Sequence, residues 1–177
     1  MLLTLHNNLF RPVANARWLL PTLARFAFIG VLLGYFWNAA LLKLGEGLWG
    51  LFFPTTGAYS QIFPRALEAV GYDTMRLDIW HWAVVVSGTA AEFVLPFLIA
   101  VGLLTRLAAL GMVAFVIIQS LTDIYGHGVD GATIGTWFDN LSDGVIVDQR
   151  TLWVVLLAIC ITKGAGPISL DRLLKIR

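Results

Sequence analysis

The stretch that decides the fold is WHWAVVVSGTAAEFVLPFLIAVGL, residues 80–103, in which Glu92 is the only charged side chain. A helix needs about 20 mostly apolar residues to cross the hydrocarbon core of a bilayer. This stretch is long enough and apolar enough to do so. It therefore predicts a membrane-spanning α-helix.

Three further apolar segments, on either side of this stretch, predict spans at residues 23–44, 107–124 and 145–162. The last of these is the least regular, because its uncharged part, residues 151–162, covers only about 18 Å as a helix. That span therefore has to begin near Val145. The first span is expected to be retained, since its apolar run is longer than that of a signal peptide.

The expected fold is all-α: a four-helix transmembrane bundle with amphipathic segments in the outer loops, forming a single integral membrane domain over residues 1–177. Composition agrees, since 58% of the residues are hydrophobic, 13% are charged and the mean hydropathy is +0.79. A soluble domain usually has about a quarter of its residues charged. Lipid is therefore expected to cover much of the surface, and a net charge of +1 gives no basic face for nucleic acid.

Charge is distributed unevenly between the connecting segments. Eight Lys or Arg residues fall in the N-terminal segment, the loop around Arg106 and the C-terminal tail, whereas the other connections carry three together with nine acids. Cytoplasmic loops are enriched in Lys and Arg. Both termini are therefore expected on the cytoplasmic side.

Two long outer connections join the spans. Residues 45–79 are rich in aromatic side chains and contain a possible amphipathic helix at 60–70, which is expected to lie on the membrane surface or to cap the bundle. Residues 122–150 are acidic and rich in glycine. After the fourth span, a short amphipathic helix capped by Ser169 is expected at the membrane interface.

Glu92 is the strongest candidate for a functional residue, because ionisable groups inside a span are costly and usually have a role. Pro96 follows four residues later and is expected to kink the helix, since it removes the hydrogen bond to the Glu92 carbonyl. Glu92 is interpreted either as a proton relay or hydrogen-bond donor to a quinone-like head group, or as an interhelical contact that fixes packing. Both interpretations stay open.

Several other polar side chains are expected to form a ring around the outer half of the bundle, with Glu92 below them. If they all face inward, they create a polar pocket open to the outside. The members of this ring are Asn38, Lys43, His81, Gln119 and Asp123. Lys43 is expected either to extend toward the interface or to pair with an outer acid such as Asp123 or Asp148.

Gly30 and Gly34, together with Asn38, form a stripe of small residues on the first span. Such a stripe allows another helix to approach closely, either inside the bundle or in a homo-oligomer. No metal site is expected, because the three histidines, three methionines and one cysteine form no spaced cluster. Haem held by His81 and His127 is not expected either. The single Cys160 excludes an internal disulfide and a C-x-x-C redox pair.

Four sequence features together resemble the DoxX family of small four-helix bacterial membrane proteins, over residues 23–174. They are ALLKL at 40–44, the mid-span Glu92, GLLTRLAA at 102–109 and GAGPISLDRLL at 164–174. The resemblance implies a bacterial inner-membrane subunit, linked to quinol oxidase or thiosulfate:quinone oxidoreductase complexes or to stress responses. It carries over no catalytic residue, and the long loop at 45–79 departs from the family pattern.

Three functional hypotheses follow. In the first, the protein is a redox- or stress-associated subunit that is not catalytic alone and binds a quinone-like or small hydrophobic ligand near Glu92. In the second, it is a non-catalytic anchor or scaffold for other membrane or periplasmic proteins. In the third, it is a small transporter, although four short spans leave little room for alternating access.

Overall fold

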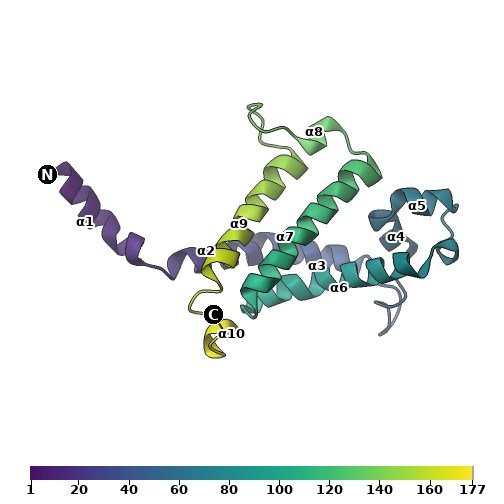
Figure 1. Ribbon diagram of the computed structural model, residues 1–177, viewed down its shortest axis with the longest axis horizontal. Coiled ribbons are helices and arrows are strands. Elements are labelled where there is room, and N and C mark those ends of the chain that lie inside the picture. The colour runs from purple at the N-terminus through teal and green to yellow at the C-terminus, as the bar shows by residue number, and fades with distance from the viewer. Residues whose placement is uncertain (177) are drawn as a thin grey trace.

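Four long apolar helices dominate the structure, a computed structural model that describes residues 1–176 (Figure 1). They cover Leu19–Leu41, Ile79–Val101, Thr105–His127 and Val145–Lys163, so each coincides closely with one predicted span. No strand occurs among the described residues. The prediction of an all-α, four-helix bundle is confirmed, and the chain is a multi-pass membrane protein.

Three of the long helices contain a π-helical segment, in which the backbone takes one residue more per turn than an α-helix. The first long helix consists of α2 (Leu19–Phe28), the π-helical segment Ile29–Leu33 and α3 (Gly34–Leu41). The second is α6 (Ile79–Val101), and the third is α7 (Thr105–Leu121) followed by the π-helical segment Thr122–His127. The fourth begins with the π-helical segment Val145–Gln149 and continues as α9 (Arg150–Lys163).

The shorter helices lie outside the four spans. They are α1 (Leu2–Asn15), α4 (Thr56–Ile62), α5 (Pro64–Ala69), a 3₁₀ turn (Thr74–Arg76), α8 (Gly131–Ile134) and α10 (Leu170–Leu173). Of these, α1 was not predicted. Its apolar side chains Leu2, Leu5 and Leu9 recur at helical spacing and all are exposed, and the helix extends away from the bundle (Figure 1).

Most of the surface of the long helices faces outward, because only 22–33% of each apolar window is buried inside the protein. Large apolar side chains such as Phe26, Leu107 and Leu152 are exposed on it. A water-soluble protein rarely exposes so large a contiguous apolar surface. Lipid chains are the environment that this surface fits.

The helices pack as two pairs, α3 with α6 and α7 with α9, and the pairs are joined by contacts of α2 with α9 and of α6 with α7. In Figure 1, α7 and α9 run side by side. Both lie close to the C-terminal end of α6 and diverge from that helix toward the end of the molecule that carries the long loops. The core between the pairs is apolar. Phe28 and Phe36 of the first span meet Met112 and Val116 of α7 and Leu157 of α9.

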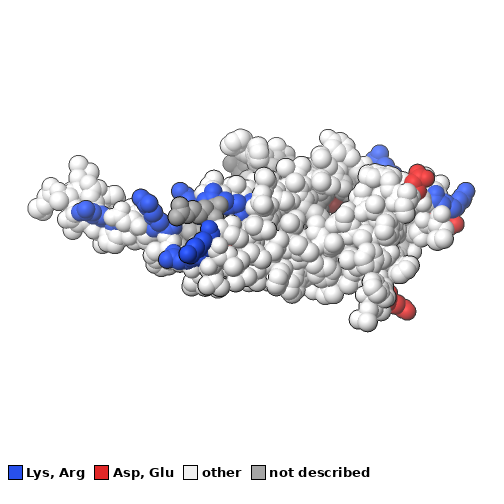
Figure 2. Space-filling model, turned by 60° about the horizontal axis from the view of Figure 1, so that its bottom comes forward, with Lys and Arg blue, Asp and Glu red and all other residues white. Residues whose placement is uncertain are grey.

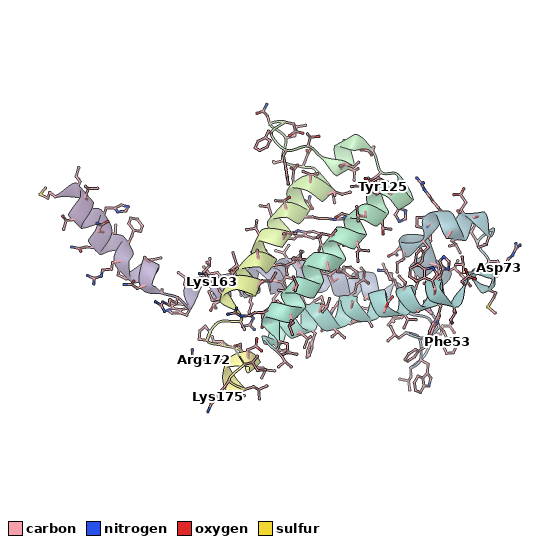
Figure 3. The ribbon with its side chains drawn as sticks, viewed as in Figure 1. Phe53, Asp73, Tyr125, Lys163, Arg172 and Lys175 are labelled. Atoms are coloured by element: carbon pink, nitrogen blue, oxygen red, sulfur yellow. The ribbon has the colours of Figure 1, made fainter. Side chains whose placement is uncertain are left out.

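The two ends of the bundle differ in charge. We call the end with residues 42–78 and 128–144 the long-loop end, and the end with residues 102–104 and 164–176 the tail end. Figure 2 shows Lys and Arg gathered around the tail end and α1, while most of the visible acids lie at the opposite end, where further Lys or Arg side chains are also visible. Figure 3 places Lys163, Arg172 and Lys175 at the tail end.

At the long-loop end, α4 and α5 cover the beginning of α6 (Figure 1). Ala58, Tyr59 and Leu67 bury Val85 beneath them, and burial raises the pKa of the Tyr59 phenol. The prediction of one amphipathic helix at residues 60–70 is wrong in detail, because α4 ends at Ile62 and α5 begins at Pro64. Proline is well tolerated as the first residue of a helix, which explains why α5 begins there.

At the tail end, Arg25 joins three segments of the chain. Its buried guanidinium donates hydrogen bonds to the carbonyls of Ile99 (3.0 Å), Ala100 (2.7 Å), Ala165 (2.7 Å) and Ile168 (2.6 Å). The last carbonyls of a helix have no partner within that helix. Arg25 therefore supplies hydrogen-bond donors to two of the last carbonyls of α6 and links the segment after α9 to that helix.

Asp171 fixes the same region from the other direction. Its carboxylate accepts hydrogen bonds from the backbone N–H groups of Leu104 (2.6 Å) and Thr105 (3.0 Å), at the beginning of α7. Its own N–H donates to the carbonyl of Gly102 (2.7 Å). The GLLTR and GPISLDR sequences are thus two halves of one structural unit, which closes the tail end.

Replacing Gly102 by alanine is expected to lower the free energy of unfolding by about 1–3 kcal/mol. Gly102 has a φ of +70°, and an added Cβ would lie 2.6 Å from the Ser169 Cβ and 3.0 Å from the Arg25 guanidinium carbon. Gly128→Ala is the matched control, because Gly128 has a φ of +65° but open space around it. Thermal unfolding in detergent micelles measures both variants, and equal losses would contradict the close packing at Gly102.

Candidate functional site

A cavity of about 400 Å³ lies between α3, α6 and α7 at the long-loop end, with α4 over it. Its walls combine apolar side chains, such as Phe115 and Ile118, with a group of polar ones. The polar side chains that line it are Tyr35, Lys43, Gln61, Ser87, Glu92, Gln119, Thr122, Asp123 and His127. We call this space the polar cavity.

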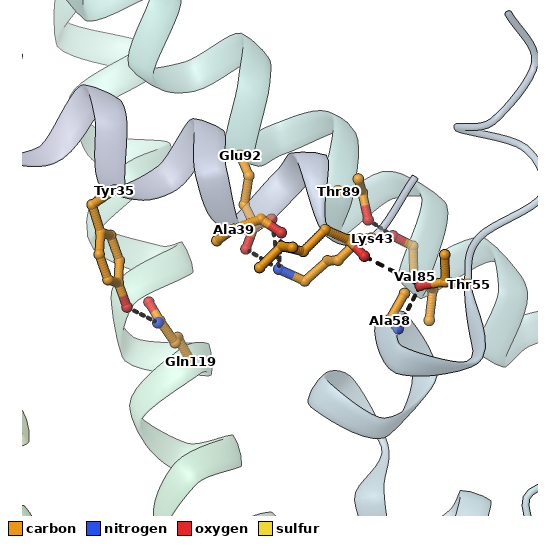
Figure 4. A network of polar contacts seen from close by, with 10 residues as sticks. Tyr35, Ala39, Lys43, Thr55, Ala58, Val85, Thr89, Glu92 and Gln119 are labelled. Atoms are coloured by element: carbon orange, nitrogen blue, oxygen red, sulfur yellow. Dashed lines mark hydrogen bonds and ion pairs between the residues drawn. The ribbon is translucent and has the colours of Figure 1, made fainter. Parts of the chain in front are cut away.

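A buried ion pair between Lys43 and Glu92 forms one wall of the polar cavity (Figure 4). The Nζ atom of Lys43 lies 2.8 Å from each carboxylate oxygen of Glu92 and 3.2 Å from the carbonyl oxygen of Ala39. The two side chains are 6% and 7% exposed. An ammonium group has three donors, so all three of those on Lys43 are used.

The ion pair explains how the carboxylate of Glu92 is tolerated in the middle of an apolar helix. Removing two charges from water costs several kcal/mol per ion, and only close pairing with further hydrogen bonds offsets that cost. Lys43 follows the end of α3, at the first turn of the loop, and its long side chain extends back along α6 to Glu92. The two charges therefore compensate each other although both side chains are almost completely buried.

A second ion pair joins α7 to α9 beside the same cavity. Arg150, which is buried, binds the carboxylate of Asp123 through Nη2 and donates from Nη1 to Ser120 Oγ at 2.9 Å. Asp123 lies in the π-helical segment that follows α7. Such segments often occur at functional sites, because the extra residue redirects the neighbouring side chains.

The far wall of the cavity offers unused hydrogen-bonding groups. Gln119 donates from Nε2 to the Tyr35 hydroxyl at 3.0 Å, and Tyr35 keeps its own O–H to donate elsewhere (Figure 4). Gln119 Oε1 is buried and, within residues 1–176, has no hydrogen-bond partner. A buried acceptor without a partner is costly. These atoms therefore provide one free donor and one free acceptor for a ligand.

The structure brings together four of the six polar residues predicted for the pocket. Lys43, Glu92, Gln119 and Asp123 line the polar cavity, whereas Asn38 and His81 do not. Asn38 is exposed on the outer surface of α3. His81 packs against Phe63, which lies between α4 and α5, with ring centroids 4.8 Å apart. The expectation that both face the pocket is therefore corrected.

The partners of the charged residues also differ from those expected. Lys43 neither extends to the interface nor binds Asp123 or Asp148, because Glu92 is within its reach and Asp123 is taken by Arg150. Sequence reasoning missed Tyr35 and Arg150 as neighbours of the cavity. One feature of the sequence indicates the role of Arg150: it directly precedes the uncharged run at residues 151–162. A cation buried at that position needs an acidic partner.

The residues predicted for helix packing divide as well. Gly30 and Gly34 are exposed, and an added Cβ on either would meet nothing within 4 Å. The expected close approach of another helix inside the bundle is therefore absent at both. Pro96 is buried within α6, which stays helical through it. Among the described residues, no group of three or more His, Cys, Asp or Glu side chains is placed to hold a metal ion.

No family model, curated protein or solved structure matches the chain. The resemblance to the DoxX family therefore stays a prediction from the residues quoted for it.

Proposed function

We propose that this multi-pass protein belongs to a bacterial inner membrane, with both termini cytoplasmic, and binds a quinone-like or similar small amphipathic ligand in the polar cavity. It acts there as a redox- or stress-associated subunit of DoxX type, together with other membrane or periplasmic proteins. The observation that carries the proposal is a cavity with free hydrogen-bonding groups, flanked by two ion pairs, inside a membrane-spanning bundle.

The size and lining of the cavity fit such a ligand. Small-molecule sites usually have volumes of about 300–1,000 Å³ and mostly apolar walls with a few placed polar groups. A volume of about 400 Å³ suits a single ring with short substituents. The Tyr35 hydroxyl can donate to a ring carbonyl, and Gln119 Oε1 can accept from a ring hydroxyl. Phe115 and Ile118 supply the apolar contacts.

The ion pairs supply groups that can exchange protons with the ligand. A quinone-like ring gains or loses protons when it gains or loses electrons. Glu92, paired with Lys43, and Asp123, paired with Arg150, are the carboxylates that line the cavity. The chain has a single cysteine, so the electrons are expected to come from a partner protein rather than from a thiol pair of this chain.

The orientation rests on the distribution of charge. Arg106, Lys163, Arg172 and Lys175 lie at the tail end, and the long-loop end holds most of the acids. The positive-inside rule supports a cytoplasmic tail end. The polar cavity faces the opposite side, where a periplasmic partner could reach it.

Tyr35→Phe and Gln119→Leu are each expected to weaken binding of a short-chain quinone analogue about three- to tenfold, because each removes one hydrogen bond to the ligand worth about 0.5–1.5 kcal/mol. Titration of the purified protein, followed by its tryptophan fluorescence, measures the affinity. Trp153 serves as the reporter, since its ring lies 5.3 Å from that of Tyr35.

Asn38→Leu is the matched control for this titration, because Asn38 lies on the same helix but on its exposed surface. It is expected to bind the analogue as the unaltered protein does. If the analogue does not bind, or if all three variants bind it equally well, the proposed ligand class is wrong.

A non-catalytic anchor is the second candidate, favoured by aromatic side chains at the tips of the loops. Phe53 is 72% exposed and Phe138 is 101% exposed, and Figure 3 shows Phe53 projecting from the long-loop end. Phe53→Ser with Phe138→Ser leaves the polar cavity unaltered. Loss of a co-purifying partner in this variant, with retention in Glu92→Gln, would favour the anchor over the ligand-binding subunit.

A further inference from the structure

A second and larger cavity, of about 860 Å³, lies at the tail end. Its walls are the beginning of α7 (residues 104–107), the end of α9 with the following turn (residues 163–166), and the segment around α10 (residues 169–176). Four cationic side chains line it: Arg106, Lys163, Arg172 and Lys175. We call this space the basic cavity.

The four cations have no acidic partner in the part of the chain that the structure describes, where the ion pairs are Lys43–Glu92 and Arg150–Asp123. The one carboxylate in the lining is Asp171, and both of its oxygens already accept hydrogen bonds from Leu104 and Thr105. The basic cavity therefore has an excess of positive charge, which favours an anion.

A buried hydroxyl gives independent evidence for a ligand. Thr105 lines the cavity and is fully buried, and its Oγ1 has no hydrogen-bond partner among residues 1–176. Buried polar groups nearly always have a partner. A phosphate oxygen in the cavity would supply one, and it would also interact with the surrounding cations.

The position of the cavity indicates where such a phosphate group comes from. It lies where α7 begins and α9 ends, which is the level at which the spans leave the bilayer. Leu104, Leu107 and Ile176 form apolar parts of its lining and are exposed. Glycerol and the first carbons of acyl chains would contact these side chains, whereas a free phosphate ion would leave them unused.

We infer that the basic cavity binds the head group of an anionic phospholipid, such as phosphatidylglycerol or cardiolipin, from the cytoplasmic leaflet. Basic pockets between membrane helices on that side are suited to such head groups. The site is preformed, because Arg25 and Asp171 hold α10 and the preceding turn against α6 and α7. This inference does not depend on what occupies the polar cavity.

Lys163→Gln with Arg172→Gln tests the site. Each cation near a membrane surface contributes about 1 kcal/mol to the binding of anionic lipid, so the double variant is expected to bind phosphatidylglycerol roughly tenfold or more weakly. Native mass spectrometry of the protein in detergent micelles doped with phosphatidylglycerol measures the retained lipid. Both side chains are exposed, so the variant is expected to fold.

Arg11→Gln with Arg17→Gln is the matched control, because it removes the same charge from the N-terminal segment, which lies outside the cavity. Its affinity for phosphatidylglycerol is expected to stay within about twofold, since neither Arg11 nor Arg17 lines the cavity. Equal losses in the two double variants would show general attraction to charge and would overturn the site.

Two further measurements distinguish the source of the phosphate group. Phosphatidylcholine in the same micelles is expected to bind weakly, and inorganic phosphate is expected neither to compete with phosphatidylglycerol nor to raise the melting temperature. Competition by inorganic phosphate would instead identify a site for a free anion. Binding of phosphatidylcholine as strong as that of phosphatidylglycerol would overturn the role of the four cations.

Discussion

Replacing Lys43 by methionine is expected to lower the free energy of unfolding by about 3–5 kcal/mol, the usual cost of leaving one member of a buried ion pair alone. Glu92 would keep its position in α6, without the two hydrogen bonds and the positive charge from Lys43 that now compensate for its burial. Unfolding in mixed micelles, followed by far-UV circular dichroism, measures the loss.

The double variant Lys43→Met with Glu92→Leu is the decisive control for this prediction. Replacing both members of a buried pair by apolar side chains of similar size is often neutral or even stabilising, so its stability is expected close to that of the unaltered protein. A loss in the double variant as large as in Lys43→Met would mean that the charges do not interact. A fully stable Lys43→Met would mean that Glu92 has access to water.

Arg25→Met is expected to have the second large effect, a loss of about 3 kcal/mol or more in the free energy of unfolding. Hydrogen bonds that involve a charged group contribute about 1.5–3 kcal/mol each, and Arg25 donates four of them to backbone carbonyls. Without them, the segment after α9 is expected to detach from α6. Limited proteolysis after Gly164 would then become faster.

Two variants serve as controls for Arg25→Met. Arg25→Lys is expected to recover only part of the stability, because a lysine cannot reproduce the fixed fork of a guanidinium group. Arg106→Met removes an exposed arginine from the same end of the bundle and is expected to change the stability little. If Arg25→Met is as stable as Arg106→Met, the four hydrogen bonds do not hold the tail end together.

Much of the fold could be predicted from the sequence, because a membrane span is a local property. Its length and apolar composition are visible in one stretch such as residues 80–103, and the hydrocarbon core requires a helix there whatever else the chain does. The same reasoning located the start of the fourth helix at Val145, although that helix is only 19 residues long. The acid in the second helix was also recognised as a residue that needs a partner.

The rotation of one part of a helix relative to the next could not be predicted where a π-helical segment lies between them. The extra residue in Ile29–Leu33 rotates the following residues by roughly 100° around the helix axis, the angle per residue of an α-helix. Tyr35, Asn38 and Lys43 all follow this segment, so it changes the direction of the three together and not their spacing around the axis. Asn38 is exposed, while Tyr35 and Lys43 line the polar cavity. Nothing in the local sequence marks the insertion of that residue.

The ion-pair and hydrogen-bond partners of the buried charged residues could not be predicted either, because they lie on segments that are distant in the sequence. The pairing of Lys43 with Glu92 joins residues 49 positions apart, and the bond of Arg25 to Ile168 joins residues 143 positions apart. From the sequence, Arg25 contributed to the prediction only as one of the positive charges that indicate the cytoplasmic side. Its structural role became visible once the ends of α6 and α9 were placed beside it.

The central claim is that Glu92 lies inside the membrane domain in contact with Lys43, at the wall of a ligand-sized cavity. Solid-state NMR in lipid bilayers tests it, on protein labelled with ¹⁵N in lysine and ¹³C in the glutamate carboxyl group. The chain has three lysines and three glutamates, and the described contacts predict one strong ¹⁵N–¹³C dipolar coupling, from Nζ atoms 2.8 Å from the carboxylate oxygens. That coupling should be absent from Glu92→Gln; a spectrum without it in the unaltered protein, or one in which it survives the substitution, would contradict the account.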